Sequence, residues 1–281
     1  MSINSRLINT GGGAGGWTIA NAVQIGTGSA NVTYNGSKAF DISADGTKML
    51  MAYDSADSQY DLVDYTLSTP FDISTLTRIN NSNYTSLGNR EPQSGKLSPD
   101  GTIFNFSTAF SGYRKAARTL MSTAYNVSTT NNFAETGYLD DTYLGYGSGY
   151  SQDGSQFYLA SWNYNVNKYR LQGWTLSTPY NVTSGLSANF NYNLTQASYN
   201  SNNALRGLTF DPTGNKMFIL LQDSGVFEWD CSTPFDPSTA VYSGISVNAS
   251  LVNRSDFKFS PDGQYLYMTG NSNTFVQFQL Y

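Results

Sequence analysis

The chain has 281 residues, with 15 Lys and Arg against 20 Asp and Glu, a formal net charge of −5, and only 12% charged residues. It has no histidine, the commonest metal ligand and general base, and its single cysteine excludes an internal disulfide or a cysteine-rich zinc site. The acidic balance argues against nucleic-acid binding, and no apolar run approaches the ~18 residues that a membrane-spanning helix needs. We therefore expect no membrane insertion, no nucleic-acid partner, no metal and no cofactor.

The N-terminal segment, residues 1–16, ends in a glycine run and lacks the apolar stretch of a signal peptide. A glycine run with no preceding strand and no phosphate-binding lysine indicates a flexible leader. Residues 17–281 are expected to form a single domain. Its first element, residues 17–25, has the pattern of a turn followed by a strand.

A four-residue turn motif then recurs along the chain. Its copies are Ser43–Gly46, Ser98–Gly101, Ser151–Gly154, Asp211–Gly214 and Ser260–Gly263, with their glycines separated by 55, 53, 60 and 49 residues. A second motif, centred on Ser-Thr-Pro-Phe-Asp or a close variant, follows in residues 67–74, 121–128, 176–183 and 231–238. Two independent markers with one period near 54 residues indicate an internal structural repeat.

Each repeat predicts four strands. An apolar run leads into the Asp-Gly turn, whose glycine supplies the positive φ of a tight hairpin, and a second apolar run such as residues 48–53 follows it. A third strand precedes the second motif, and a fourth follows it. Four antiparallel strands, repeated radially, are typical of a β-propeller blade.

The chain ends predict the number of blades and their closure. There are five Asp-Gly-type turns but four copies of the second motif, and residues 275–281 complete only a third strand. The strand after Trp17 should supply the missing fourth strand and close the last blade, leaving no open sheet edge. The expectation is an all-β, five-bladed propeller.

The repeated Ser-Pro-Asp-Gly turn before an apolar strand resembles the YVTN/TolB-like propeller group. With the second motif and the leader Ser2–Gly13, the chain also resembles appendage proteins of marine tailed phages. This resemblance implies a virion protein, extracellular after host lysis, whose leader contacts other virion proteins.

Propellers usually bind ligands where the loops entering the innermost strands converge on the central channel. Counting back from the turns places Asp256 beside the channel among small residues, where its carboxylate could bind a cation or order water. Asp41, nearer the opposite end, is expected to face Lys96 and Lys258 in a structural ion-pair ring. The predicted ligand-binding residues at the channel mouth are Lys38, Arg90, Gln93, Tyr146, Arg206, Arg254 and Asp256.

Amide, aromatic and guanidinium groups suit a carbohydrate, and Arg206 and Arg254 suit its carboxylate or sulfate groups. The predicted function is a non-enzymatic phage tail-fibre protein, a host-attachment adhesin that binds a surface polysaccharide. One alternative is a purely structural virion protein, with the polar residues serving only as turns. Another is a propeller-type glycoside hydrolase, which would need two or three carboxylates about 5–9.5 Å apart around the axis. Only Asp41, Glu91 and Asp256 lie near the expected inner strands.

Overall fold

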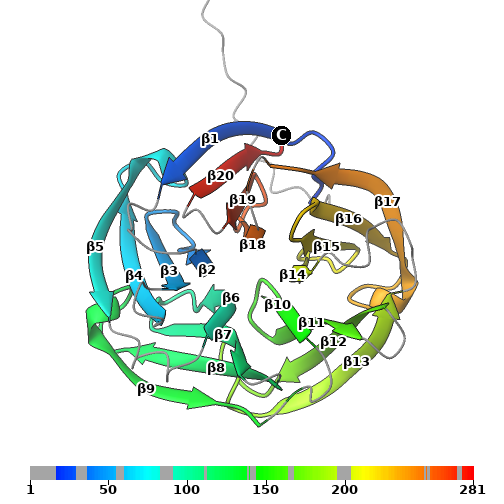
Figure 1. Cartoon of the computed structure of the whole chain (residues 1–281), viewed down its shortest axis with the longest axis horizontal. Helices are drawn as coiled ribbons and strands as arrows, with labels where there is room; N and C mark the ends of the chain where they lie inside the picture. Colours follow the sequence, from blue (N-terminus) through cyan, green and yellow to red (C-terminus); the bar gives the residue numbers. More distant parts are fainter. Residues whose placement is uncertain are drawn as a thin grey trace, which may run out of the picture.

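The computed structural model describes most of the chain from Trp17 to Tyr281. The residues it describes are 17–29, 37–54, 60–82, 91–110, 113–137, 139, 144–163, 168–194, 204–249, 251, 254–270 and 274–281. The predicted leader, residues 1–16, lies outside this part of the chain. The described part is all-β, with a few short 3₁₀ turns, and its strands form a ring around a central axis (Figure 1).

Twenty strands make up the described part of the ring. They are β1 (Val23–Ser29), β2 (Ser37–Ile42), β3 (Lys48–Asp54), β4 (Tyr60–Leu67), β5 (Leu76–Ser82), β6 (Glu91–Leu97), β7 (Ile103–Phe110), β8 (Tyr113–Met121), β9 (Thr130–Glu135), β10 (Leu144–Tyr150), β11 (Gln156–Asn163), β12 (Lys168–Leu176), β13 (Leu186–Leu194), β14 (Leu205–Phe210), β15 (Lys216–Leu221), β16 (Gly225–Cys231), β17 (Ala240–Val247), β18 (Arg254–Phe259), β19 (Tyr265–Gly270) and β20 (Thr274–Gln279).

These strands form three sheets of four and one sheet of eight. The four-stranded sheets have the orders β2-β3-β4-β5, β6-β7-β8-β9 and β1-β20-β19-β18. The eight-stranded sheet has the order β13-β12-β11-β10-β14-β15-β16-β17, and its central pair, β10 and β14, is parallel. The repeat predicts five separate four-stranded sheets. The hydrogen bonding differs from this prediction, because two of the expected sheets are joined into one.

Glycines explain why β10 and β14 approach closely enough to pair. A Cβ on Gly149 would lie 1.4 Å from the carbonyl oxygen of Leu208, and a Cβ on Gly147 would lie 2.6 Å from the backbone of Arg206. With no side chains at these positions, the two backbones come into contact and Ser148 pairs with Gly207.

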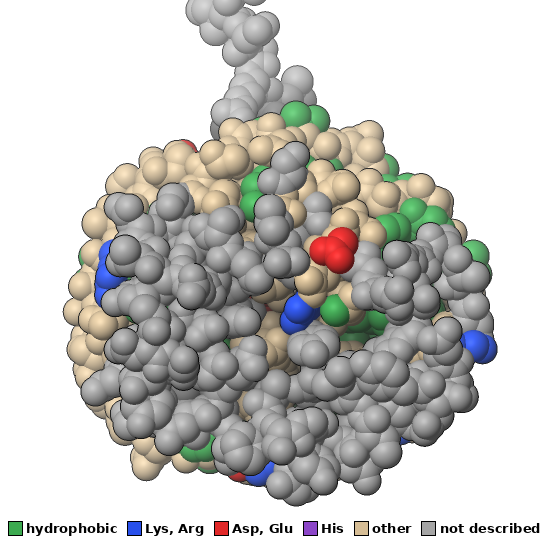
Figure 2. Space-filling model, viewed as in Figure 1, with side chains coloured by type: hydrophobic (Ala, Val, Ile, Leu, Met, Phe, Trp, Pro, Cys, Tyr) green, Lys and Arg blue, Asp and Glu red, His purple; other side chains and the backbone are tan. Residues whose placement is uncertain are grey.

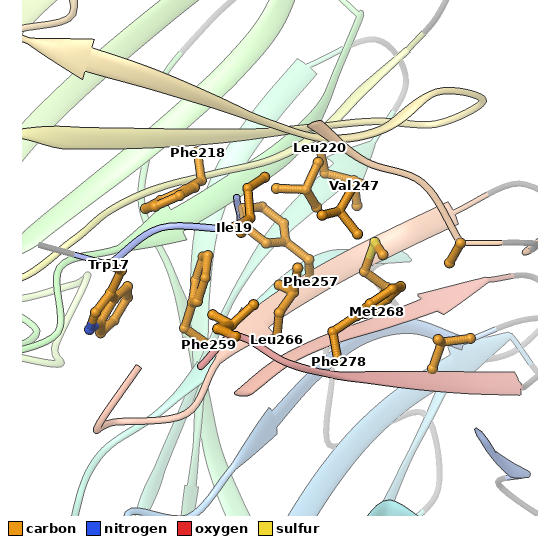
Figure 3. Close-up of a cluster of buried hydrophobic side chains, with 14 of the residues drawn as sticks. Trp17, Ile19, Phe218, Leu220, Val247, Phe257, Phe259, Leu266, Met268 and Phe278 are labelled. Carbon is orange, nitrogen blue, oxygen red and sulfur yellow. The ribbon is translucent and has the colours of Figure 1, made fainter. Parts of the chain in front are cut away.

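The N-terminal strand pairs with the C-terminal one, as the sequence predicts. Strand β1 runs antiparallel to β20, and the two lie side by side in Figure 1. Just before β1, Trp17 stacks on Phe259 with ring centroids 4.8 Å apart, and Ile19 is buried in the same hydrophobic cluster (Figure 3). Contacts between the two ends of the chain therefore join the ring.

The repeated turns share one construction. Their glycines have φ between 67° and 74°, and an aromatic ring lies directly against each of them. The rings belong to Phe71, Tyr125, Tyr180, Phe235 and, at Gly263, Trp17. Trp17 thus takes at the N-terminus the place that the second motif fills in the other repeats.

Candidate functional site

Five strands, β2, β6, β10, β14 and β18, lie nearest the axis in Figure 1. Each contains a β-bulge, where one residue has no partner on the neighbouring antiparallel strand. The bulged residues are Lys38, Gln93, Tyr146, Arg206 and Ser255. A bulge redirects a side chain from the regular pleat, and bulges are over-represented beside functional sites.

Two of these bulged residues meet across the axis. The Arg206 guanidinium donates from Nη1 to Gln93 Oε1 at 3.4 Å and from Nε to Gln222 Oε1 at 2.8 Å. Gln93 is 3% exposed, and its Nε2 has no hydrogen-bond partner among the described residues. Since a guanidinium can only donate, the amide oxygen must face Arg206, and the amide N–H groups are left for another acceptor.

A buried polar cluster lies one step further along the axis. Asp256 has no exposed surface and accepts from Lys258 Nζ at 2.8 and 2.9 Å, from Ser94 Oγ at 2.9 Å and from the Phe40 N–H at 3.2 Å. Lys258 Nζ also lies 3.3 Å from Ser94 Oγ. Burial raises the pKa of Asp256 above its ordinary value, and this effect outweighs the opposing effects of Lys258 and the hydrogen bonds.

Toward the repeated turns, Asp41 pairs with Lys96 at 3.3 Å and accepts the Leu97 N–H at 2.8 Å. The predicted ion-pair ring therefore forms in part, because Lys258 pairs with Asp256 and not with Asp41. These contacts use carboxylate oxygens to join neighbouring inner strands.

The structure brings together part of the predicted site. Gln93 and Arg206 meet, while Asp256 lies buried on the side of them toward the turns. Lys38, Tyr146 and Arg254 lie on β2, β10 and β18, but their side chains, like the whole of Arg90, fall outside the described residues.

The sequence analysis identified neither Gln222 as a partner of Arg206 nor Ser94 as a partner of Asp256. Nothing local marks Gln222, since it follows β15 as an ordinary polar turn residue. The role of Ser94 depends on Asp256, which lies 162 positions away in sequence.

Figure 2 shows one face of the ring, with basic and acidic side chains near its middle. In the part of the chain that the structure describes, no group of three or more His, Cys, Asp or Glu could hold a metal ion. The same part contains no helix long and apolar enough to cross a membrane.

Comparisons with known proteins give structural likeness only. No protein-family description matches the chain, and no curated protein matches it. A candidate 6-phosphogluconolactonase of Bacteroides uniformis is 17% identical with a TM-score of 0.43, and a periplasmic gluconolactonase of Pseudomonas aeruginosa is 14% identical with a TM-score of 0.47. Each match covers 82% of this chain. The chain spans about three fifths of each of the two proteins, 63% of the first and 62% of the second.

These findings correct the expectation drawn from the resemblance to phage proteins. The structural neighbours are bacterial lactonases, one of them periplasmic, and nothing links the chain to a virion, so the assignments to a phage adhesin, a structural virion protein and a virion location are wrong. The expectation of a non-enzymatic protein is overturned by the same neighbours, which also give no support to a glycoside hydrolase.

The physical reason is that, apart from the leader, the resemblance rested on turn motifs. An Asp that caps a hairpin and a Gly with positive φ are required by the turn itself, whatever the protein does. At these identities and TM-scores, the lactonase likeness in turn assigns neither activity nor location to this chain.

Proposed function

We propose that the chain is a propeller of five four-stranded blades that binds a hydroxylated, carboxylate-bearing ligand of the sugar-acid type at the Gln93–Arg206 end of its axis. In the blade count, the eight-stranded sheet contributes two blades that meet at β10 and β14. The ring of inner strands, the repeated turn and the pairing of β1 with β20 support this architecture.

The unpaired amide of Gln93 is the observation that carries the binding proposal. A buried donor without a partner is unfavourable by about 1–3 kcal/mol, so an acceptor that reaches it gains that free energy. The adjacent Arg206 guanidinium favours a negatively charged acceptor. A carboxylate that accepts from both groups would satisfy the Gln93 amide beside the positive charge of Arg206, and the sugar hydroxyls would face the mouth of the channel.

The test is calorimetric titration of the protein with gluconate and glucuronate, with glucose as the uncharged comparison. Saturable binding of the acids, weakened roughly tenfold or more in Gln93→Leu and in Arg206→Gln, is expected from the loss of one charge-assisted contact. Arg170→Gln is the matched control, because Arg170 bonds Asn191 on the outer strands. Absence of binding, or equal binding by all variants, would contradict the proposal.

Binding of larger acidic saccharides follows from the same chemistry. We expect alginate to compete with glucuronate for the site and neutral dextran not to compete. Competition by both polymers would show that the carboxylate contributes nothing to binding. This result would contradict the proposed role of Arg206 in binding a carboxylate.

A second candidate function, hydrolysis of a sugar lactone, is favoured by the cluster of Ser94, Lys258 and Asp256. A hydroxyl within hydrogen-bond reach of a carboxyl group whose pKa is raised, beside an ammonium group, is an arrangement suited to nucleophilic or general acid–base catalysis.

Hydrolysis is tested by following the opening of gluconolactone against its spontaneous rate. The two structural neighbours are named for their action on lactones of this kind, and their names serve here only to choose the assay substrate. A rate above the spontaneous one that disappears in Ser94→Ala and in Asp256→Asn, while Arg170→Gln keeps it, is expected for an enzyme. A rate equal to the spontaneous one would leave binding as the function of the axis.

A further inference from the structure

A cavity lies toward the other end of the axis from Gln93 and Arg206, on the side of the repeated turns. Its lining comes from β6, β10, β14 and β18, from the turn that follows β10, and from Trp17, all within the described residues. Its volume is about 30 Å³. A single water needs about 10–15 Å³ by the same measure, so the cavity holds two waters or one small ion but not a sugar ring.

Two residues that line this cavity carry a buried hydroxyl group with no partner in the part of the chain that the structure describes. Ser148 is 1% exposed and Tyr150 is 5% exposed, and neither hydroxyl has a hydrogen-bond partner among the described residues. Both side chains line the cavity. Burial raises the pKa of Tyr150 well above its ordinary value, so its hydroxyl keeps its proton and remains a donor. Buried hydroxyls are normally satisfied, and these two need an acceptor.

The charges in the lining have one sign. Lys96 and Lys258 line the cavity and no carboxylate does. The Lys258 ammonium donates to Asp256 and lies within hydrogen-bond distance of Ser94. The Lys96 ammonium forms an ion pair with Asp41, with Nζ 3.3 Å from Oδ2. An ammonium carries three N–H donors, so Lys96 can still donate into the cavity.

We infer that this cavity is a binding site for one small oxyanion, a carboxylate or phosphate group, that accepts hydrogen bonds from Ser148 Oγ, Tyr150 Oη and Lys96 Nζ. Its lining offers donors from two hydroxyls and an ammonium, and an oxyanion supplies acceptors only. Because it is separated from Gln93 and Arg206 along the axis, the site is independent of the proposed sugar-acid site.

The experiment measures thermal unfolding of the full chain in acetate and in inorganic phosphate, with chloride replacing either anion at constant ionic strength. A ligand that binds the folded state raises the Tm in a saturable way. Phosphate and acetate are separate arms, so the preferred source of the oxyanion is read from their apparent Kd values.

The informative variant is Ser148→Ala/Tyr150→Phe, which removes both hydroxyls with little change in volume. It breaks no hydrogen bond of the unliganded protein, so its Tm in chloride should be unchanged or higher, while its anion-dependent rise should require a roughly tenfold or greater increase in concentration. Lys96→Gln should have the same effect on the anion dependence, and Lys168→Gln, on outer strand β12, serves as its charge-matched control.

Two results would overturn the inference. One is the absence of any rise in Tm with acetate or phosphate beyond that with chloride. The other is the same anion-dependent rise in the double hydroxyl variant as in the unchanged protein, which would place the anion elsewhere. The double variant decides the question even if Lys96→Gln fails to fold after losing its pair with Asp41.

Discussion

At the scale of single residues, the carboxyl group of Asp256 is subject to two opposing effects. Burial disfavours its charged form, while Lys258 and the hydrogen bonds from Ser94 and Phe40 favour it. Burial is the stronger effect, so the pKa is higher in the folded chain than the ordinary value of 3.8. The ion pair with Lys258 therefore fixes the geometry of the axis more than it adds stability.

This balance predicts the pH dependence of stability. A carboxyl whose pKa is raised on folding contributes its full stability below its unfolded pKa, and this contribution is lost as pH rises through the folded pKa. Asp256→Asn keeps a neutral side chain at every pH. We expect the free energy of unfolding of the unchanged protein, relative to Asp256→Asn, to fall as pH rises from below 3.8. Urea unfolding at a series of pH values checks this, and a rise in that difference would mean that Lys258 outweighs burial.

A turn glycine gives a second residue-scale prediction. Gly101 has φ of 69°, and a Cβ there would lie 2.3 Å from the ring of Tyr125. Gly101→Ala should lower the free energy of unfolding by about 1–3 kcal/mol through backbone strain and displacement of the ring. Gly137→Ala is the control, because nothing lies within 4 Å of its added Cβ. Equal effects of the two substitutions in urea unfolding would show that the ring contact is unimportant.

At the scale of elements, the pairing of β10 with β14 depends on missing side chains. Gly149 allows the Leu208 carbonyl to occupy the space of a Cβ, which no rotamer change could relieve. Gly149→Ala should force the two strands apart and lower the free energy of unfolding by at least about 2 kcal/mol.

Hydrogen exchange locates this effect, since protection should fall first in β10 and β14. The matched comparison is Gly26→Ala on β1, where the nearest atoms to an added Cβ are 3.8 Å away. Loss of protection spread evenly over all sheets would contradict a local separation of these two strands.

At the scale of the whole molecule, residues 17–19 join the C-terminal sheet, which holds β18 to β20, to the eight-stranded sheet. Thr18 Oγ1 and the Ile19 N–H both donate to Glu228 at 2.8 Å, and Glu228 is fully buried and paired with Lys216. Trp17 is 6% exposed and covers Phe259 and Gly263. Closure therefore combines a hydrophobic contact with a buried carboxylate that fixes the direction of the segment.

Trp17→Ala should lower the free energy of unfolding by about 3–5 kcal/mol, the usual effect of removing a large buried aromatic side chain. Chemical denaturation measures this, and Val23→Ala on the same segment, where Val23 is 62% exposed, should change it by less than about 0.5 kcal/mol. A small effect of Trp17→Ala would show that β1 closes the ring by strand pairing alone.

Much of the architecture could be predicted because its signals are local. The Asp-Gly turns, the strands around them and the replacement of the missing fourth strand by residues after Trp17 all follow from patterns a few residues long. Gln93 and Arg206 were both predicted at the axis. Their contact was not, since the two residues are 113 positions apart. Function could not be predicted from the same patterns, because the repeated motifs that suggested phage proteins are required by the turns themselves.

The sequence by itself determined an all-β chain with a repeated turn and with no histidine or disulfide chemistry, because composition and short-range backbone preferences are properties of neighbouring residues. Only the tertiary structure decided that β10 pairs with β14, that Glu228 holds Thr18 from 210 positions away, and that Ser148 and Tyr150 share a cavity with Lys96. These contacts depend on how closely separate sheets approach, and that distance is set by the packing of the whole ring.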